Sequence, residues 1–509
     1  MGRAPYARLA KAERIISHPG LQANGEAAGT SSCLLRNAGV LTFLRLKIRR
    51  CFPPVFRYNG FMSHYLTAPV STPGMPGGIP YIIVNDVAER FSFYGLRAIL
   101  VIFMTQYLMS SDGQLATLAD EDATSYFHLF TATAYFLPLL GAIVADAFWG
   151  KYKTIILLSL VYCAGHFSLF LDDTQIGLFL GLTLVAVGSG GIKPCVASNV
   201  GDQFGRTNKH LLSRAYSWYY LGINLGSSTS SLLTPWLLEH YGPAVAFGVP
   251  GAFMALATLT FWAGRREFVH IPPAGKGYLQ DITGPEGRRV VKRLLVIYVL
   301  VAAFWSLFDQ QGSTWVLQAQ NMDRMVFGVE LLPAQILAAN PFLIILLIPT
   351  FTYLIYPAMN RLFEVTPARK MCIGMFLALT PFLVTAWCES QIQQGLTPHI
   401  SWQLLAYLLL SIAEVMLVIT VMEFSYTQAP KRMKSLVMSF FYLSISAGNV
   451  FTAVVNQIIQ NPDGSTKLEG AMYHLFFAGF MGTAAVLFAF YMASYDMDFI
   501  IHDEVVSNG

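Results

Sequence analysis

The chain has 509 residues, of which 54% are hydrophobic and only 12% are charged, with a net charge of +4. Soluble globular proteins carry about 25% charged residues, so the composition excludes an ordinary soluble enzyme. With 37 Phe, 24 Tyr and 8 Trp, the chain is also too apolar to stay disordered in water. Its six cysteines are scattered, which indicates neither a disulfide framework nor a metal site. The composition therefore predicts a membrane protein.

Residues 1–61 form a basic segment with ten basic and two acidic residues. Its one apolar run is interrupted by Arg36, Arg45 and Lys47, so it is neither a membrane span nor a signal peptide. Two interpretations stay open. The segment is either a cytoplasmic extension lying on the inner leaflet or an upstream addition to a protein that starts at Met62.

Twelve apolar runs follow, each long enough to cross about 30 Å of hydrocarbon as a helix. They are 79–109, 123–147, 152–172, 175–203, 211–237, 244–264, 292–320, 333–357, 368–388, 401–427, 434–459 and 470–494. Residues 265–291 are rich in Gly, Pro and charge and divide the runs six and six. We expect an all-α membrane protein with six-helix bundles at 79–264 and 292–494, joined by a cytoplasmic linker and followed by a tail at 495–509.

The positions of Lys and Arg predict the orientation. Of the 33 basic residues, 18 fall in the loops on one side of the predicted spans, whereas only Arg324 and Lys467 fall in the loops on the other. Cytoplasmic loops carry the excess of Lys and Arg. Both termini and the linker are therefore expected in the cytoplasm of a cell whose inner membrane the chain crosses many times.

Charged residues recur at helical spacing inside the first span. Asp86, Glu89, Arg90, Tyr94 and Arg97 are three or four residues apart, so they share one helical face. Charges at this depth are costly and usually mark the path of a substrate or ion. The alternative is a salt-bridge cluster that only fixes helix packing.

Four further ionisable residues lie inside predicted spans. His128 titrates near neutral pH and is a candidate proton carrier, or else a neutral histidine bonded to a neighbouring helix. Lys193 needs a carboxylate partner, either Glu89 or that of a substrate. Asp309 and Glu414 lie near the middle of the seventh and tenth spans.

The charges suit a zwitterionic ligand held between the two halves. The arginines and the lysine of the first half suit a carboxylate, and Glu414 of the second half suits an ammonium group. Amide and aromatic side chains would complete the cavity, as ligand sites combine a few polar groups with apolar walls. These are Phe93, Tyr94, Asn224, Trp305 and Asn340. For Phe93 and Trp305, ordinary helix packing explains the residue equally well.

Six stretches of the sequence are distinctive: AERFSFYGLRAIL, GAIVADAFWGKYKTI, GSGGIKPCVASNVGDQF, WYYLGINLGS, FDQQGSTW, and MEFSYTQAPKRMKS with the GN that follows it. They resemble motifs of the proton-dependent oligopeptide transporter family of the major facilitator superfamily. The similarity extends from about Gly78 to the last span and includes both halves. It implies the major facilitator fold, with twelve transmembrane helices, and proton-coupled import of di- and tripeptides by alternating access.

The resemblance also implies roles for individual residues. The proton-coupling positions correspond to Asp86, Glu89, Arg90, His128, Lys193 and Asp309. The peptide-binding positions correspond to Tyr94, Arg97, Tyr135, Lys193, Asn224, Trp305, Asn340 and Glu414. No cofactor, metal or nucleic acid is implied, and we expect a monomer in the lipid bilayer.

The sequence departs from the family pattern at several positions. Asp86 stands where the motif has Glu, Phe93 stands where Tyr is common, and Phe441 stands where Trp is usual. Two other functions remain possible: a transporter of the same fold for another solute such as an amino acid or nitrate, and a nutrient sensor that has lost transport. An enzyme is not expected, because no nucleophile with a base and no phosphate-binding loop is present.

Overall fold

The computed structural model describes residues 65–273, 275, 285–428, 434–461 and 466–495. The predictions for residues 1–61, for residues 274 and 276–284 of the linker and for nearly all of the tail lie outside these residues. Contacts within the chain divide it into residues 1–61 and residues 62–509, and only the second unit is described here.

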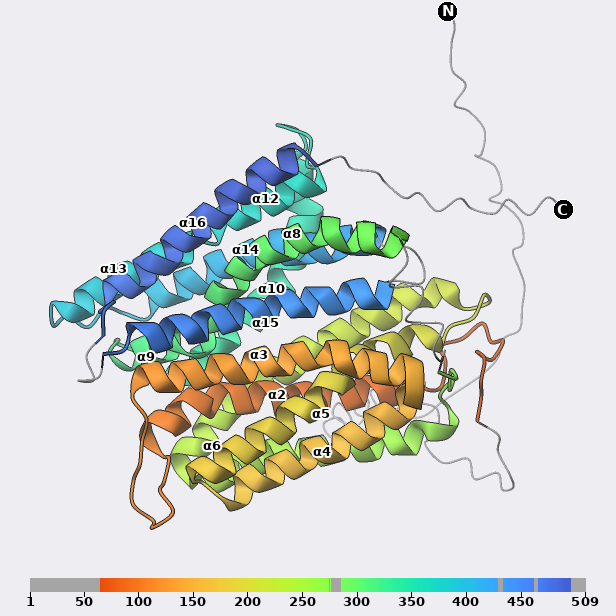
Figure 1. Ribbon diagram of the computed structural model, residues 1–509, viewed down its shortest axis with the longest axis horizontal. Helices are drawn as coiled ribbons and strands as arrows, with labels where there is room; N and C mark the ends of the chain where they lie inside the picture. The colour runs from red at the N-terminus through yellow and green to blue at the C-terminus, as the bar shows by residue number, and fades with distance from the viewer. Residues whose placement is uncertain (1–64, 274, 276–284, 429–433, 462–465, 496–509) are drawn as a thin grey trace, which may run out of the picture. The chain divides into compact units, whose positions relative to one another are not determined.

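The described chain is almost entirely helical (Figure 1). The longer helices are α2 (Ile79–Gln106), α3 (Asp120–Val144), α4 (Lys151–Leu171), α5 (Gln175–Asp202), α6 (Leu212–Ala263), α8 (Pro285–Phe308), α10 (Ala339–Thr350), α12 (Pro367–Leu377), α13 (Thr380–Gln393), α14 (Ser401–Gln428), α15 (Lys434–Ile459) and α16 (Ala471–Ala493). Short 3-10, π and α segments join or extend them: η1 (Ala145–Trp149), η2 (Lys209–Leu211), η3 (Gly264–Arg266), η4 (Asp309–Gly312), α9 (Thr314–Gln320), η5 (Pro333–Ala338), η6 (Phe351–Ile355) and α11 (Tyr356–Met359).

Strands are confined, within the described residues, to one small antiparallel hairpin. Its strands are β1 (Met325–Val326) and β2 (Val329–Glu330), with Met325 opposite Glu330 and Val326 opposite Val329. The hairpin connects α9 to η5.

Ten helical stretches of the described chain are long and apolar enough to cross a membrane. One of them contains α6, which is about twice the length that a single span needs. Gly242 interrupts α6 with φ 78° and ψ −179°, a conformation that side-chain-bearing residues hardly ever adopt. The helix α2 is not among the ten, and it carries the charged stripe of the first predicted span. A total of twelve spans remains a prediction.

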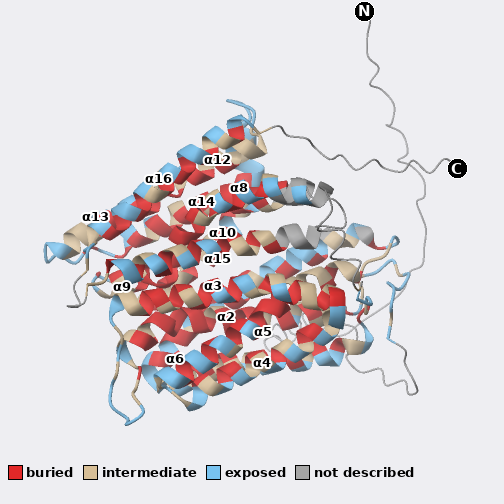
Figure 2. Ribbon diagram, in the orientation of Figure 1, coloured by how far each residue is buried: buried red, intermediate tan, exposed pale blue. Residues whose placement is uncertain are grey.

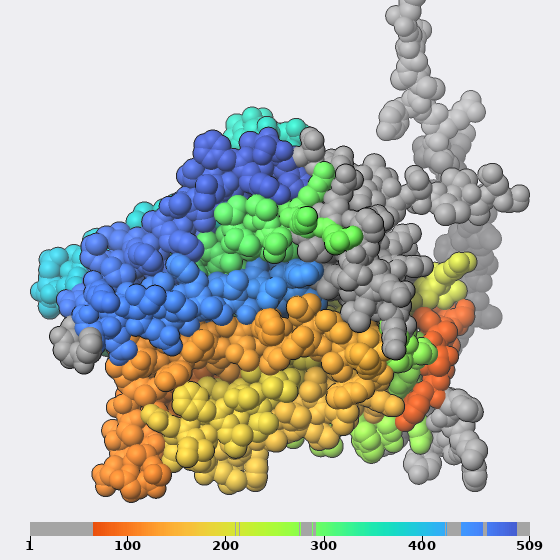
Figure 3. Space-filling model, in the orientation of Figure 1, coloured from red at the N-terminus to blue at the C-terminus, as the bar shows by residue number. Residues whose placement is uncertain are grey.

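The helices form two groups that pack against each other. In the first group, α2 packs on α6 and α4 packs on α5 and α6; in the second group, α8 packs on α15 and α16, and α12 packs on α14 and α16. The contact of α3 with α15 joins the groups along their length, as the orange and blue atoms show in Figure 3. We call α2–α6 the first helix group and α8–α16 the second helix group.

Buried residues lie mainly on the helix faces that meet other helices (Figure 2), whereas many large apolar residues are exposed. Phe167, Tyr353 and Phe490 are examples of the exposed ones. In water such a surface would be unfavourable, but against lipid tails it is not, which fits helices that lie in a bilayer.

The last residue of α2, Gln106, lies at one end of the helices. The backbone N–H of Met109, just beyond it, donates to the carbonyl of Asp173 in the connection between α4 and α5 at 3.1 Å. We call this the Gln106 end and the opposite one, where α2 begins, the Ile79 end.

Candidate functional site

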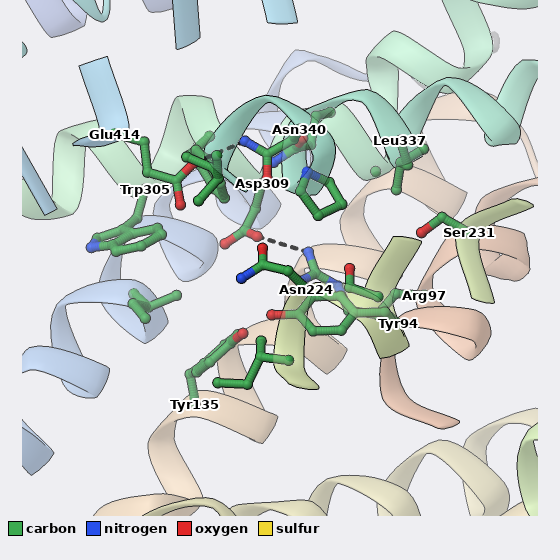
Figure 4. Close-up of a pocket in the computed structure, with 18 of the residues that line it drawn as sticks. Tyr94, Arg97, Tyr135, Asn224, Ser231, Trp305, Asp309, Leu337, Asn340 and Glu414 are labelled. Atoms are coloured by element: carbon green, nitrogen blue, oxygen red, sulfur yellow. Dashed lines mark hydrogen bonds and ion pairs between the residues drawn. The ribbon is translucent and has the colours of Figure 1, made fainter. Parts of the chain in front are cut away.

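A cavity of about 220 Å³ lies between the two helix groups (Figure 4). Residues of α2, α3 and α6 line one side, and residues of α8, η4, η5, α10, α14 and α15 line the other. The polar and aromatic side chains around it are Tyr94, Arg97, Tyr135, Tyr220, Asn224, Ser227, Ser231, Trp305, Phe308, Asp309, Gln311, Asn340 and Glu414. Seven of the eight residues predicted to bind peptide line this cavity, and Lys193 does not.

The guanidinium of Arg97 forms an ion pair across the cavity between the helix groups. Its Nη2 lies 2.7 Å from Oδ1 of Asp309. The second carboxylate oxygen of Asp309 accepts a hydrogen bond from Nδ2 of Asn449, at 2.6 Å. Both charged side chains are more than 90% buried, so each depends on the other to compensate its lost hydration.

The imidazole of His128 continues this network. Its Nδ1 lies 2.7 Å from Oδ1 of Asn449, and its Nε2 lies 3.0 Å from Oγ of Ser313. Because Asn449 donates to Asp309 through Nδ2, its Oδ1 is the acceptor, so Nδ1 of His128 carries a proton. Nε2 then accepts from Ser313, and a second proton on the ring would reverse that hydrogen bond. His128 is thus bonded to neighbouring elements and also able to take up a proton.

The carboxylate of Glu414 lies on the wall formed by the second helix group. Nδ2 of Asn340 donates to its Oε2 at 2.8 Å and to Oγ of Ser411 at 3.1 Å. Trp305 lines the same side, and its buried Nε1 has no hydrogen-bond partner among the described residues. This wall therefore offers an anion and an unused N–H donor, while Arg97 places a cation on the opposite wall (Figure 4).

The charged cluster at the start of α2 lies outside the cavity lining. Nε of Arg90 is 3.4 Å from Oδ1 of Asp86 and 3.4 Å from Oε2 of Glu89. The second oxygens of both acids, Asp86 Oδ2 and Glu89 Oε1, are buried and have no hydrogen-bond partner in the described part of the chain. The cluster thus forms ion pairs within itself, but one oxygen of each acid lacks a hydrogen-bond partner among the described residues.

The side chain of Lys193 contacts aromatic rings. Its Nζ lies 3.1 Å from the ring centroid of Phe93 and 4.7 Å from that of Tyr135. The sequence led us to expect a carboxylate partner, but Nζ makes no hydrogen bond within the described ranges. Phe93 is fully buried and does not line the cavity, so of its two interpretations the structure supports packing.

Sequence reasoning missed Asn449 and Ser313 as partners of His128 and missed Tyr220, Ser227 and Ser231 as cavity residues. The sequence signal for Asn449 is limited, because an amide inside an apolar span is costly unless it is hydrogen-bonded, which indicates that a partner exists but not which one. For the serines no such signal exists, since a hydroxyl inside a helix can bond to its own backbone, as Ser230 does to Ser227.

Comparisons of the chain with known sequences and structures point to one family. The sequence profile of the POT family matches residues 152–284 and 278–472. Peptide transporter family 1 of Drosophila melanogaster is 36% identical over 367 residues, which are 63% of this chain and 48% of that protein. Solute carrier family 15 member 2 of Rattus norvegicus is 35% identical over 397 residues, which are 68% of this chain and 53% of that protein. The chain thus spans about half the length of these animal relatives.

The similarity to solved structures extends over more of this chain than the similarity to these two relatives. The crystal structure of the POT family transporter PepTSo superimposes with a TM-score of 0.76 at 36% identity, covering 84% of this chain and 99% of PepTSo. A crystal structure described as an auto inhibited POT family peptide transporter gives the same values.

Proposed function

The chain belongs to the POT family, and from this membership and the charges around the cavity we propose that it is a proton-coupled symporter that imports di- and tripeptides by alternating access. The proposal rests on the positions of Arg97 and Glu414, which lie on opposite walls of one small cavity. A peptide has a carboxylate at one end and an ammonium at the other, and the two walls complement these ends. Peptide transporter family 1 of Drosophila melanogaster and the auto inhibited POT family transporter are peptide transporters by name, which supports this choice of substrate.

Arg97 is the residue that would exchange partners during transport. Here its guanidinium is bound to Asp309. A proton arriving from the Gln106 end would add to a carboxylate oxygen of Asp309 and neutralise it. Arg97 would then be free to bind the carboxylate of the peptide, while Glu414 and Asn340 bind its amino group. A difference of a few kcal/mol between two states is enough for such coupling.

His128 is the expected entry point for that proton. It is joined to Asp309 through Asn449 and lies on α3, whose first residues belong to the Gln106 end. The cluster of Asp86, Glu89 and Arg90, together with Lys193, would form a second proton-handling site in the first helix group. Protonation of Asp309 would weaken the ion pair with Arg97 that joins the two helix groups, whereas protonation of Asp86 or Glu89 would weaken ion pairs within α2.

The orientation follows from the loop charges. We place the Gln106 end outside and the Ile79 end in the cytoplasm, because the basic loops lie at the Ile79 end. Twelve spans in an inner cell membrane then leave both termini inside. A monomer suffices for the mechanism, because both walls of the cavity come from one chain.

Uptake by the purified protein in liposomes tests the proposal. Labelled dialanine is supplied outside, with or without an inward proton gradient, and with free alanine as competitor. We expect accumulation that needs the gradient and is not inhibited by alanine. Equal inhibition by free alanine would favour an amino-acid carrier. Binding without accumulation would favour a sensor, and neither result is compatible with the proposal.

A further inference from the structure

The ammonium group of Lys193 is held by aromatic faces. Its Nζ is 3.1 Å from the ring centroid of Phe93 and 4.7 Å from that of Tyr135, and the side chain is 98% buried. A desolvated cation over an aromatic face gains free energy, because the face of the ring carries partial negative charge. This gain partly offsets the high cost of a charge at membrane depth.

The ring of Phe93 is fixed in the orientation that this contact needs. Its centroid is 5.6 Å from that of Tyr94 at an interplanar angle of 82°, and 6.2 Å from that of Tyr135 at 85°. These edge-to-face contacts, together with complete burial, prevent the ring from turning its edge to the ammonium. Arg97 is the only other cation within reach of this face among the described residues, with its guanidinium carbon at 5.8 Å, and Asp309 binds that guanidinium.

Lys193 also has competing electrostatic partners. The charged and titratable groups that face it are Glu89, Arg90 and Arg97 of α2, Asp309 of η4 and Tyr135 of α3. Of the two carboxylates, Asp309 is bound to Arg97 and Asn449, whereas Oε1 of Glu89 has no hydrogen-bond partner within the described residues. Glu89 and Phe93 are four residues apart in α2, so they share one helical face, and the carboxylate of Glu89 is the alternative partner for the ammonium that lies on the ring of Phe93.

We propose that Phe93 is a positioning residue of the proton-coupling cluster: its ring holds Lys193 away from Glu89 and thereby sets how readily Glu89 exchanges its proton. The proposal rests on the proposed function. With Lys193 on the ring, a proton from water adds to the unpartnered Oε1 of Glu89 and weakens only the ion pair with Arg90. With Lys193 bound to Glu89, the proton must also displace the lysine from the carboxylate, so the step requires a higher proton concentration.

Fluorinated phenylalanines at position 93 test this directly. Each added fluorine withdraws electron density from the face of the ring and changes its size very little. With one, two and three fluorines, the half-maximal pH of dialanine uptake should move stepwise toward acid, and uptake near neutral pH should fall by about twofold to fivefold in total. That range corresponds to a loss of roughly 0.4–1 kcal/mol. The KM for dialanine measured at acidic pH should stay unchanged.

Two substitutions with natural amino acids give the smallest and the largest pH shift expected at position 93. Phe93→Tyr keeps an aromatic face and should keep the parental pH profile. Phe93→Leu removes the face and should show the largest shift. A structural defect alone would lower uptake at every pH and would leave the half-maximal pH where it is.

Phe130 provides the matched control. Its ring is 6.2 Å from that of Phe93 and nearly buried, and no Lys or Arg lies over it among the described residues. The same fluorinated residues at position 130 should leave the pH profile unchanged. Profiles that coincide through the series at position 93, or that move equally at position 130, would overturn the proposal.

The melting temperature of the purified protein supplies a readout that does not require transport. It should fall stepwise with fluorine number at position 93 and not at position 130. If the parental protein shows no proton-driven dialanine uptake while this trend holds, the proposed function fails and the contact of Phe93 with Lys193 stands. If uptake is normal and the trend is absent, the contact contributes nothing and the inference is wrong.

Discussion

Glu414 is the residue whose charge decides whether the cavity recognises an amino group. The variant Glu414→Gln keeps an acceptor for Asn340 but removes the negative charge. A hydrogen bond to a charged group contributes about 1.5–3 kcal/mol, so the apparent affinity for dialanine should fall about 10-fold to 100-fold. Competition against labelled dialanine measures this change.

An N-acetylated dialanine, which lacks the ammonium group, shows whether the loss is specific. The parental protein should strongly prefer free dialanine over the acetylated form, and Glu414→Gln should lose most of that preference. Glu469→Gln serves as a control, since Glu469 is exposed in the loop before α16. An unchanged preference in Glu414→Gln would show that Glu414 does not bind the amino group.

At the same scale, the sequence indicated which residues carry charge but not which atoms they contact. The spacing of Asp86, Glu89 and Arg90 placed them on one helical face, and they do pair within α2. The partner of His128 could not be predicted, because Asn449 is 321 positions away in the chain and its position depends on how α3 packs against α15. For the same reason the ring contact of Lys193 was not expected.

At the scale of elements, hydropathy was sufficient to locate the helices. The run 175–203 corresponds to α5 at Gln175–Asp202, and the run 434–459 corresponds to α15 at Lys434–Ile459. Hydropathy did not reveal where helices change their geometry. The π-helical turn at η1 and the 3-10 turn at η4 depend on packing and on the ion pair of Asp309, which local sequence does not encode.

The glycines of α3 and α5 allow these two helices to approach closely. A Cβ atom on Gly141 would lie 3.0 Å from the backbone nitrogen of Gly191 and 3.2 Å from the carbonyl oxygen of Gly190. Backbone atoms cannot move aside as a flexible side chain can, so Gly141→Ala should force the helices apart. Overpacking of this kind costs about 1–3 kcal/mol, and the melting temperature of the purified protein should fall by several degrees.

Gly479 is the matched control for this substitution. It lies in α16, and a Cβ atom there would meet nothing within 4 Å. Gly479→Ala should leave the melting temperature unchanged or raise it slightly, because Ala favours the helix over Gly by about 1 kcal/mol. If both substitutions lowered it equally, the close approach of α3 and α5 would not be a determinant of stability.

At the scale of the whole molecule, contacts near the Gln106 end hold the two helix groups together. Nε2 of Gln335 in η5 donates to the carbonyl oxygen of Leu232 in α6 at 2.9 Å. Cysteines at these two positions, joined by a short reducible thiol cross-linker, should keep this end closed. Dialanine uptake should then be lost and should return on reduction, which an uptake assay before and after treatment measures.

Each single-cysteine variant, treated in the same way, controls for reaction at native cysteines such as Cys163 and Cys372, which are partly exposed. Both should retain uptake. Transport that continues in the cross-linked double variant would show that this end need not open, and alternating access between the two helix groups would be excluded.

The chain of side chains from His128 through Asn449 and Asp309 to Arg97 has a consequence for energetics. It links α3, α15, η4 and α2, so one continuous set of hydrogen bonds belongs both to the proton site and to the closure of the molecule. Under the proposed mechanism, proton binding and peptide binding share one coupling free energy, and the relation is reciprocal. The factor by which a proton alters the affinity for peptide must equal the factor by which a peptide alters the affinity for the proton. A substitution at Asn449 that touches neither ligand would therefore change both factors together.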